Sequence, residues 1–370
     1  MKNIIKFIKK DIVLAIAAVL ALISMFFIPP SLKYLSYINF SVLGILFCLM
    51  AVVAGFMEIG VFNFISAKLL AKSKNLKTLT IILINCVFFS SMFFTNDVAL
   101  IAFVPITIGI FNILGNERLI FIIVMETVAA NMGSMITPIG NPQNLYIYSF
   151  YNMNIADFLK VVVPVGIIGY VIITCIILFS KNGSIEILYE RQPAAGDIKP
   201  LFLAYYSSLF ILCILTVLHV LDYRICVIAV LASIVIVNRK LLKKVDYNLL
   251  LTFVAFFIFT GNIEQINIIK TAINHFITGR TFILSVLTSQ IISNVPAAMM
   301  ISRFTNDANN LLLGVDVGGI GTLVASLASL ISFKLYSKSS GAKPAKYLLT
   351  FTVYNAVILV LLSAVVFLIY

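Results

Sequence analysis

Long apolar runs separated by short polar segments occupy most of this chain. A helix needs about 20 apolar residues to cross the hydrocarbon core of a bilayer, so each long run is a candidate span. Two of the runs are interrupted by polar residues, glycine and proline. The candidate spans are residues 12–28, 38–57, 118–149 (interrupted), 158–180, 201–220, 225–238, 247–262, 308–333 (interrupted) and 347–369. The pattern predicts an all-α polytopic membrane protein.

Two further apolar regions, residues 78–114 and 281–305, do not fit a single span. The first carries Thr95-Asn96-Asp97 near its middle, and the second carries Ser293-Asn294. We expect each region to form two short helices that meet at a polar tip, as a re-entrant helical hairpin. Backbone groups freed at membrane depth are tolerated only where protein or a water-filled cavity surrounds them.

The positions of the basic residues support this topology, because cytoplasmic loops of membrane proteins are enriched in lysine and arginine. With a cytoplasmic N-terminus and two hairpins that do not cross, twenty of the 26 basic residues fall on the cytoplasmic side. Counting either hairpin as a full span would invert every later segment. We therefore expect a multi-pass protein of the cytoplasmic (cell) membrane, with its N-terminus inside and its C-terminus outside.

The predicted elements occur in the same order in two parts of the chain. A span, an amphipathic segment, a hairpin, a broken span and a closing span follow one another in residues 38–180 and again in residues 241–370. The first series begins outside and the second inside, so we expect inverted repeats, as in many secondary transporters. Residues 1–37 add a transmembrane helix, and residues 181–240 add a cytoplasmic linker and two transmembrane helices.

Composition narrows the possible functions. Apolar residues make up 62% of the chain and charged residues 11%, whereas about one quarter of a soluble domain is charged. The net charge of +12 does not indicate nucleic-acid binding, because the basic residues cluster between apolar runs. The five cysteines form no Cys-x-x-Cys pair, so we expect no metal or disulfide framework. The sequence lacks the motifs of metalloproteases, serine hydrolases and ATP-binding loops, and we expect no enzyme activity.

The first hairpin tip and the break in the next span contain residues suited to ion binding. Side-chain oxygens and backbone carbonyls suit Na⁺, whereas backbone amides at a helix N-terminus suit an anion. Glycine permits close approach of the backbone to a ligand, and proline frees backbone groups from helical hydrogen bonds. The candidate residues of this half are Thr95, Asn96, Asp97, Gly133, Ser134, Thr137, Pro138, Gly140, Asn141 and Pro142. Simple helix capping by Asn96 and Asp97 is the alternative, and it is compatible with coordination.

The second hairpin tip and its matching break repeat this pattern. The candidate residues are Ser293, Asn294, Val295, Pro296, Gly318, Gly319, Gly321 and Thr322. No acidic residue here corresponds to Asp97, so the two ion sites should differ. The residues that could hold Na⁺ are Asn96, Asp97 and Gly133 in the first half, and Ser293, Asn294 and Gly318 in the second.

Three acidic residues lie at apparent membrane depth, where ionisable groups are costly and usually functional. Asp97 is the strongest candidate for cation coordination or proton transfer, and Glu126 and Asp316 are further candidate proton sites. A structural hydrogen bond is the alternative role for Glu126. Arg303, about nine residues after the second tip, could anchor its helix at the membrane interface or attract an anionic substrate. Glu264 begins an amphipathic segment and is expected at the surface or as a helix cap.

These motifs resemble a known group of transporters. The first tip with the segment from Gly133 to Asn144, and the second tip with Gly318-Gly319-Ile320-Gly321-Thr322, are similar to the citrate-transporter-like domain of the ion transporter superfamily. That group includes divalent anion:sodium symporters, arsenite-efflux permeases and NhaD-type sodium/proton antiporters. The resemblance covers residues 38–369, and it implies an elevator-like movement of the hairpin-bearing domain, often within a homodimer.

In the dicarboxylate symporters of this superfamily, each tip carries Ser-Asn-Thr and binds Na⁺ and substrate carboxylates. Asn96 and Asn294 match that pattern, whereas Asp97 and Val295 stand where a hydroxyl residue would be. A carboxylate beside an anionic substrate would repel it unless a cation or proton lies between them. The Asn-Asp pair therefore brings the first tip closer to the arsenite and sodium/proton branches.

We predict an ion-coupled secondary transporter that moves a small anion, either a carboxylate or an inorganic oxyanion. Arsenite efflux and Na⁺/H⁺ antiport are the alternatives within the superfamily, and a channel is a further alternative. We expect Na⁺ or H⁺ as the coupling ion and no other cofactor. The expected partners are the lipid bilayer, the anionic substrate and a second copy of the chain, and not nucleic acid.

Overall fold

The computed structural model describes residues 12–70, 75–111, 115–180 and 197–370, and within these residues the regular structure is entirely helical. The helices of the first part of the chain are α2 (Ile12–Phe27), α3 (Tyr34–Tyr37), α4 (Phe40–Glu58), α5 (Val61–Leu70), α6 (Leu76–Phe94), α7 (Asn96–Phe111), α8 (Asn116–Ser134), α9 (Pro142–Phe150) and α10 (Ile155–Leu178). These bounds confirm that the predicted helical regions are helices, and that the chain breaks near Asn96 and again after Ser134.

The second part of the chain repeats this order of elements. It contains α11 (Pro200–Val217), α12 (Tyr223–Asn238), η3 (Arg239–Lys244), α13 (Tyr247–Gln265), α14 (Asn267–Ile277), α15 (Thr281–Ile292), α16 (Asn294–Ile301), η4 (Ser302–Phe304), α17 (Ala308–Gly318), α18 (Leu327–Ser337) and α19 (Pro344–Ile369). The series from α4 to α10 and the series from α13 to α19 therefore correspond element by element. The inverted relation of the two series, and the domain boundaries drawn from it, remain predictions.

Asparagine and aspartate side chains fix where several of these helices begin. Asn39, Asn75, Asn141 and Asp307 each accept a hydrogen bond from a backbone N–H in the first turn, of α4, α6, α9 and α17 respectively. Such a cap satisfies a donor that the helix itself cannot pair, and typically contributes about 1 kcal/mol. Polar caps at the ends of apolar runs thus account for the helix starts that the sequence predicts.

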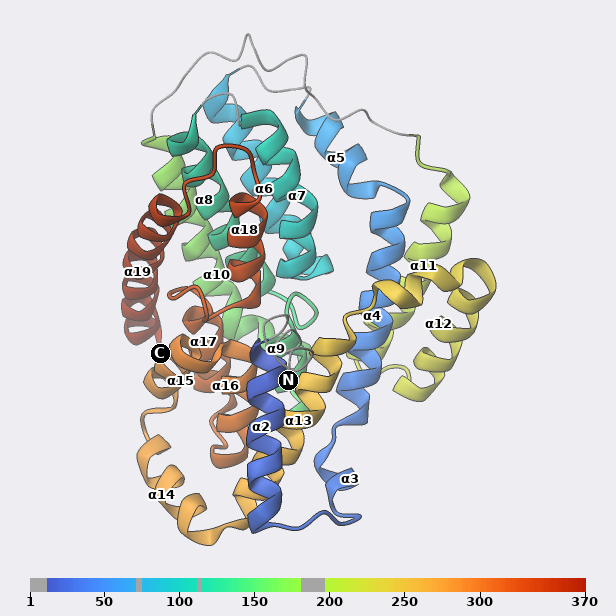
Figure 1. Ribbon diagram of the computed structural model, residues 1–370, viewed down its shortest axis with the longest axis vertical. Helices are drawn as coiled ribbons and strands as arrows, with labels where there is room; N and C mark the ends of the chain where they lie inside the picture. The colour runs from blue at the N-terminus through green and yellow to red at the C-terminus, as the bar shows by residue number, and fades with distance from the viewer. Residues whose placement is uncertain (1–11, 71–74, 112–114, 181–196) are drawn as a thin grey trace.

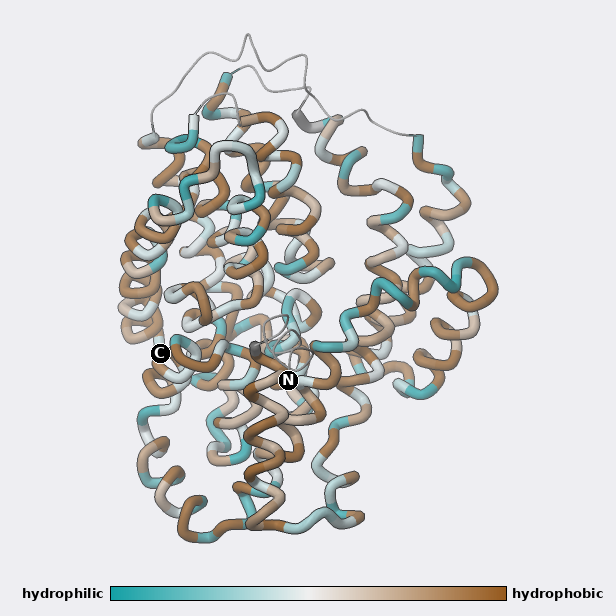
Figure 2. The backbone as a smooth tube through the Cα atoms, viewed as in Figure 1, coloured by the Kyte–Doolittle hydropathy of each residue, from teal (hydrophilic) through white to brown (hydrophobic). Residues whose placement is uncertain are grey.

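Seven helices are long and apolar enough to cross a membrane, among the residues that the structure describes. Many of their large side chains face outward, as Ile236 and Leu368 do with exposed fractions of 83% and 85%. Hydrophobic colours dominate the helices in Figure 2. Apolar side chains on the outer surface of a helical protein suit a lipid environment, and the chain is a multi-pass membrane protein.

The helices form two groups by their contacts, and Figure 1 shows α4, α11 and α12 of one group beside α6, α7 and α8 of the other. We call α6–α10 and α15–α19, with η4, the hairpin bundle. We call α2–α4 and α11–α14, with η3, the frame, and α5 links the two. The groups meet where α4 and α13 of the frame pack on α9 and α16 of the bundle.

Candidate functional site

The first hairpin turns at a single residue. Helix α6 ends at Phe94 and α7 begins at Asn96, and Thr95 between them has φ 72° and ψ 151°. Helices α6 and α7 contact each other in the bundle, as a hairpin requires. The backbone N–H of Asn96 donates to the carbonyl of Gly140 at 3.1 Å. The first tip is therefore joined to the loop between α8 and α9.

The second hairpin turns in the same way. Ser293 lies between α15 and α16 with φ 78° and ψ 153°. The backbone N–H of Asn294 donates to the carbonyl of Ala325 at 2.9 Å. Each tip asparagine thus starts a helix and binds the broken span of its own half, so the two tips have the same local geometry.

The break in the first half is a compact loop over residues 135–141. Asn144 draws it together, because its Nδ2 donates to the carbonyls of Met135 at 3.0 Å and Thr137 at 3.3 Å. The Thr137 hydroxyl donates to the carbonyl of Met92 in the hairpin. Pro142 is the first residue of α9, where its missing N–H costs no helical hydrogen bond. Pro138 is buried within the loop.

The break in the second half is held by Gln290 of α15. Its Nε2 donates to the carbonyl of Gly318 at 2.7 Å, and its Oε1 accepts from the N–H of Thr322 at 2.8 Å. The Thr322 hydroxyl donates to the Gln290 carbonyl at 2.9 Å. Gly321 has φ 154°, and a Cβ there would meet the Gln290 side chain at 2.1 Å.

Two candidate glycines serve helix packing. A Cβ on Gly133 would lie 2.1 Å from the carbonyl oxygen of Phe88, and one on Gly318 would lie 2.9 Å from the side chain of Ser289. Both glycines belong to helices, α8 and α17, so the unwound loops begin after them. Their missing side chains let these helices approach the first arm of each hairpin, and the expected close approach to a ligand stays a prediction.

Asn131 brings the two halves together. Its Oδ1 accepts hydrogen bonds from Asn96 Nδ2 at 3.0 Å and Ser326 Oγ at 3.1 Å. Its Nδ2 donates to the carbonyl of Gly319 at 3.4 Å. A Cβ on Gly319 would lie 2.7 Å from Asn294 Nδ2. The first tip, the second loop and the second tip therefore converge on one buried polar centre.

Asp316 joins the halves at a second place. Its Oδ1 accepts from Asn141 Nδ2 at 3.2 Å and from Gln143 Nε2 at 3.3 Å. Asn141 also donates to Ser134 Oγ at 3.4 Å. The Oδ2 atom of Asp316 is buried and has no hydrogen-bond partner among the residues described. A buried carboxylate held only by neutral amides can still accept a proton or a cation.

Asp97 and Glu126 lie in different surroundings. Asp97 is half-buried beside the first tip, and no ion pair formed by described residues includes it. The carboxyl group of Asp246, which caps the start of α13 in the frame, acts on it electrostatically. Glu126 is fully buried and accepts from the Thr107 hydroxyl at 2.5 Å. It precedes Asn131 by five residues, about 7.5 Å along α8, and its hydrogen bond goes to Thr107 and not to the polar centre.

A small cavity borders the second tip. Its volume is about 20 Å³, room for about one water-sized species, and it is lined by Asp246, Ser293, Val295 and Pro296 among others. Asp246 therefore contributes negative charge close to both tips, although it belongs to the frame. Across the described residues, no three His, Cys, Asp or Glu side chains gather as a metal site.

Several residues of this site were not among those predicted. The sequence contains the signal for Asn131 and Gln290, since each is an amide side chain inside an apolar helix. Asn144 and Gln143 follow Pro142 directly in the motif, and Ser326 caps no helix through its side chain. Asp246 carries no comparable signal, because its sequence position reads as an ordinary helix cap.

Comparison with known proteins shows the family of the chain. The family model described as "Citrate transporter" matches residues 3–327. An uncharacterised transporter of Methanocaldococcus jannaschii is 34% identical over 295 residues, which are 78% of this chain and 79% of that protein. The inner membrane protein YbiR of Escherichia coli is 28% identical over 293 residues, 78% of this chain and 77% of YbiR. The human P protein is 30% identical over 123 residues, 32% of this chain and 14% of that protein.

Proposed function

Because the chain belongs to the citrate transporter family, we propose that this membrane transporter is a secondary transporter that moves a small anion, a carboxylate or an inorganic oxyanion, across the cell membrane. The observation that supports the proposal most is the position of Asn131. Its side chain links the first tip to the second broken span, so the unwound segments surround one place. The substrate lies there, between Asn96 and Asn294.

The helix ends at this place suit both an anion and a cation. Helices α7 and α16 begin at the two tips, and the N-terminus of a helix attracts negative charge. The carbonyls of the unwound loops and the side-chain oxygens suit Na⁺. Na⁺ or H⁺ is the coupling ion, with candidate positions at Asn96 and Asp97 and at Ser293 and Asn294.

Arsenite efflux or Na⁺/H⁺ antiport is the second candidate, and the acidic surroundings of the tips favour it. The carboxyl groups of Asp97 and Asp246 interact electrostatically there, and the second tip borders the cavity that Asp246 lines. Two carboxylates attract a cation and repel an organic anion. In this alternative Asp97 binds and releases the transported cation or proton.

Transport requires that the site face each side of the membrane in turn. The division into a hairpin bundle and a frame suits a movement of the bundle against the frame, in a protein with its N-terminus in the cytoplasm. A homodimer would hold two frames still relative to the bilayer.

Uptake into proteoliposomes tests the proposed function. Radiolabelled citrate, sulfate, phosphate and arsenite are each offered with a Na⁺ gradient, with a pH gradient and with neither. We expect saturable uptake of one of these anions under only one gradient. Saturable Na⁺/H⁺ exchange without anion uptake would support the second candidate, and currents that do not saturate would indicate a channel.

The variant Asp97→Asn then tests the coupling. Removing the charge should abolish the dependence of uptake on the gradient, because Asp97 is the acidic residue of the first tip. Asp157→Asn is the control, since Asp157 is exposed on α10 and its one ion pair among the described residues is with Lys160. Coupling that stays the same in Asp97→Asn would remove this residue from the cation site.

A further inference from the structure

The contact between the frame and the hairpin bundle is largely apolar and aromatic. Phe94 of α6 lies 5.4 Å from Phe56 of α4 and 5.7 Å from Phe210 of α11, measured between ring centroids. Tyr146 of α9 lies 5.8 Å from Phe257 of α13. Apolar contact is non-directional, so one such surface can slide over another at small cost.

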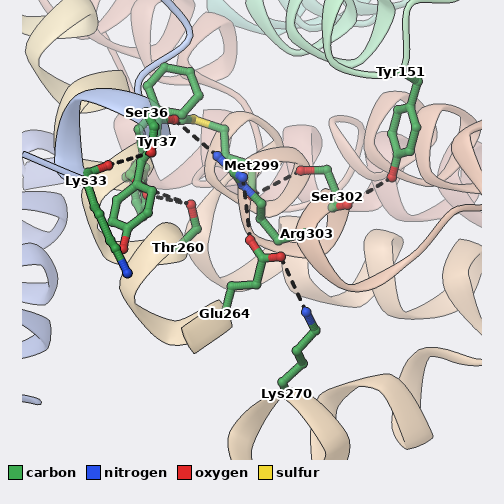
Figure 3. Close-up of polar contacts among 12 residues, drawn as sticks. Lys33, Ser36, Tyr37, Tyr151, Thr260, Glu264, Lys270, Met299, Ser302 and Arg303 are labelled. Carbon is green, nitrogen blue, oxygen red and sulfur yellow. Dashed lines mark hydrogen bonds and ion pairs between the residues drawn. The ribbon is translucent and has the colours of Figure 1, made fainter. Parts of the chain in front are cut away.

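One turn of the hairpin bundle is hydrogen-bonded to the rest of the bundle, so the turn and the bundle should move together. Ser302 begins η4, and its hydroxyl lies 2.7 Å from the Tyr146 hydroxyl of α9. The hydroxyl of Tyr151 donates to the carbonyl of Ser302 at 3.1 Å and to that of Thr305 at 2.7 Å. Figure 3 shows Tyr151 reaching this turn from the opposite side to the frame residues. Residues 302–305 therefore move with α9 as one piece.

Arg303 projects from this fixed turn to the frame. Its Nη1 lies 3.5 Å from Glu264 Oε2 at the end of α13, and its Nη2 donates to the carbonyl of Tyr37 in α3 at 3.1 Å (Figure 3). Its guanidinium also lies over the ring of Phe150, 5.4 Å from the centroid. Glu264 is held in turn by Lys270 of α14 at 3.4 Å, within the frame.

Arg303 makes the polar contacts between the frame and the hairpin bundle. Every hydrogen bond and ion pair that joins a described frame residue to a described bundle residue comes from this side chain. The other ion pairs of the described residues lie within the frame, as Lys244–Glu58 and Lys270–Glu264 do, or within the bundle. Arg303 and Glu264 are only 18% and 27% exposed, so solvent screens this pair less than it screens a surface pair.

We propose that Arg303, with Glu264 and the Tyr37 carbonyl, is a latch that holds the hairpin bundle in one position on the frame and must open in each transport cycle. This proposal rests on the proposed function, because only a transporter of this kind needs the bundle to move. The apolar interface permits several positions of the bundle, and the directional contacts of Arg303 select one of them. Arg303 is thus a positioning residue in this proposal, a role that the sequence, with its alternatives of interfacial anchor and attraction of an anionic substrate, did not suggest.

Distance measurements between spin labels test the latch without any substrate. The labels are attached at Lys33→Cys on the frame and Asn309→Cys on the bundle, both at exposed positions. Cys175, an exposed cysteine, is replaced by alanine, and the cysteines at 48, 86, 213 and 226 are buried. Double electron–electron resonance in lipid nanodiscs then gives the distribution of distances between the two labels in the full chain.

Without the latch, fewer molecules should show the main distance between the labels and more should show a second distance. In Arg303→Gln and in Glu264→Gln, the population at the second distance, divided by the population at the main distance, should rise about fivefold. A change of this size is expected for the loss of a partly buried ion pair. The double variant should rise no further than Arg303→Gln alone, because both changes remove the same contact. Arg303→Lys, which keeps the charge, should stay closer to the parent.

Lys270→Gln is the matched control. It removes the other cation bound to Glu264, but both partners belong to the frame, so the distribution should not change. An unchanged distribution in Arg303→Gln and Glu264→Gln, or an equal change in Lys270→Gln, would overturn the latch. If the distances shift as expected while the proteoliposomes transport none of the tested anions or cations, the latch stands and the proposed function fails.

Discussion

Replacing Asn131 with alanine should separate the two halves of the candidate site. The change removes the acceptor of Asn96 and Ser326 and the donor to the carbonyl of Gly319. Hydrogen bonds between helices within a membrane contribute about 0.6 kcal/mol on average and up to about 1.7 kcal/mol. Three such contacts place the loss in the free energy of unfolding at about 2 kcal/mol. The melting temperature should then fall by about 3 °C for a chain of this length.

Thermal unfolding in detergent, followed by circular dichroism, measures the stability, and proteoliposome uptake of the transported ion measures the function. The matched control is Asn355→Ala, because Asn355 is also fully buried but bonds only to the carbonyl of Phe351 in its own helix. We expect Asn131→Ala to lose uptake and to melt below Asn355→Ala. Equal melting temperatures together with normal uptake in both variants would show that Asn131 does not unite the halves.

Two further predictions concern the packing around the site. Gly133→Ala and Gly318→Ala should each lower the free energy of unfolding by about 1–3 kcal/mol through overpacking, whereas Gly109→Ala, which meets open space, should not destabilise the protein in the same melting assay. Gln290→Ala should free the second loop, and faster hydrogen exchange at the Thr322 amide, which Gln290 binds, would show this by mass spectrometry. Unchanged exchange there would mean that the loop holds its shape without Gln290.

The helices and their interruptions could be predicted because they depend on local sequence. A polar group inside an apolar run must find a partner, and Asn96 and Asn294 therefore signal a break whatever the rest of the fold does. Proline and glycine between Ser134 and Pro142 give a similarly local signal. The family resemblance, carried by the same motifs, is confirmed by the match over residues 3–327.

The roles of individual side chains depend on distant segments, and the sequence could not reveal them. The sequence does not reveal that Gly133 lies against the backbone of Phe88 and leaves room for it. Asp246 caps α13, and only the folded chain brings its charge near Asp97. Arg303 is one of many basic residues, and its partner Glu264 becomes apparent only when α13 lies beside η4. The substrate and coupling roles of the site residues remain predictions.

Thr95 and Ser293 occupy a region of backbone space that is essentially reserved for glycine. Each costs on the order of 1–3 kcal/mol there, and glycine at either position would remove that cost. A chain selected only for ease of folding would therefore carry glycine at both. Because the chain carries two hydroxyl residues instead, we infer that the function of these two side chains outweighs the free-energy cost of their strained backbone conformation.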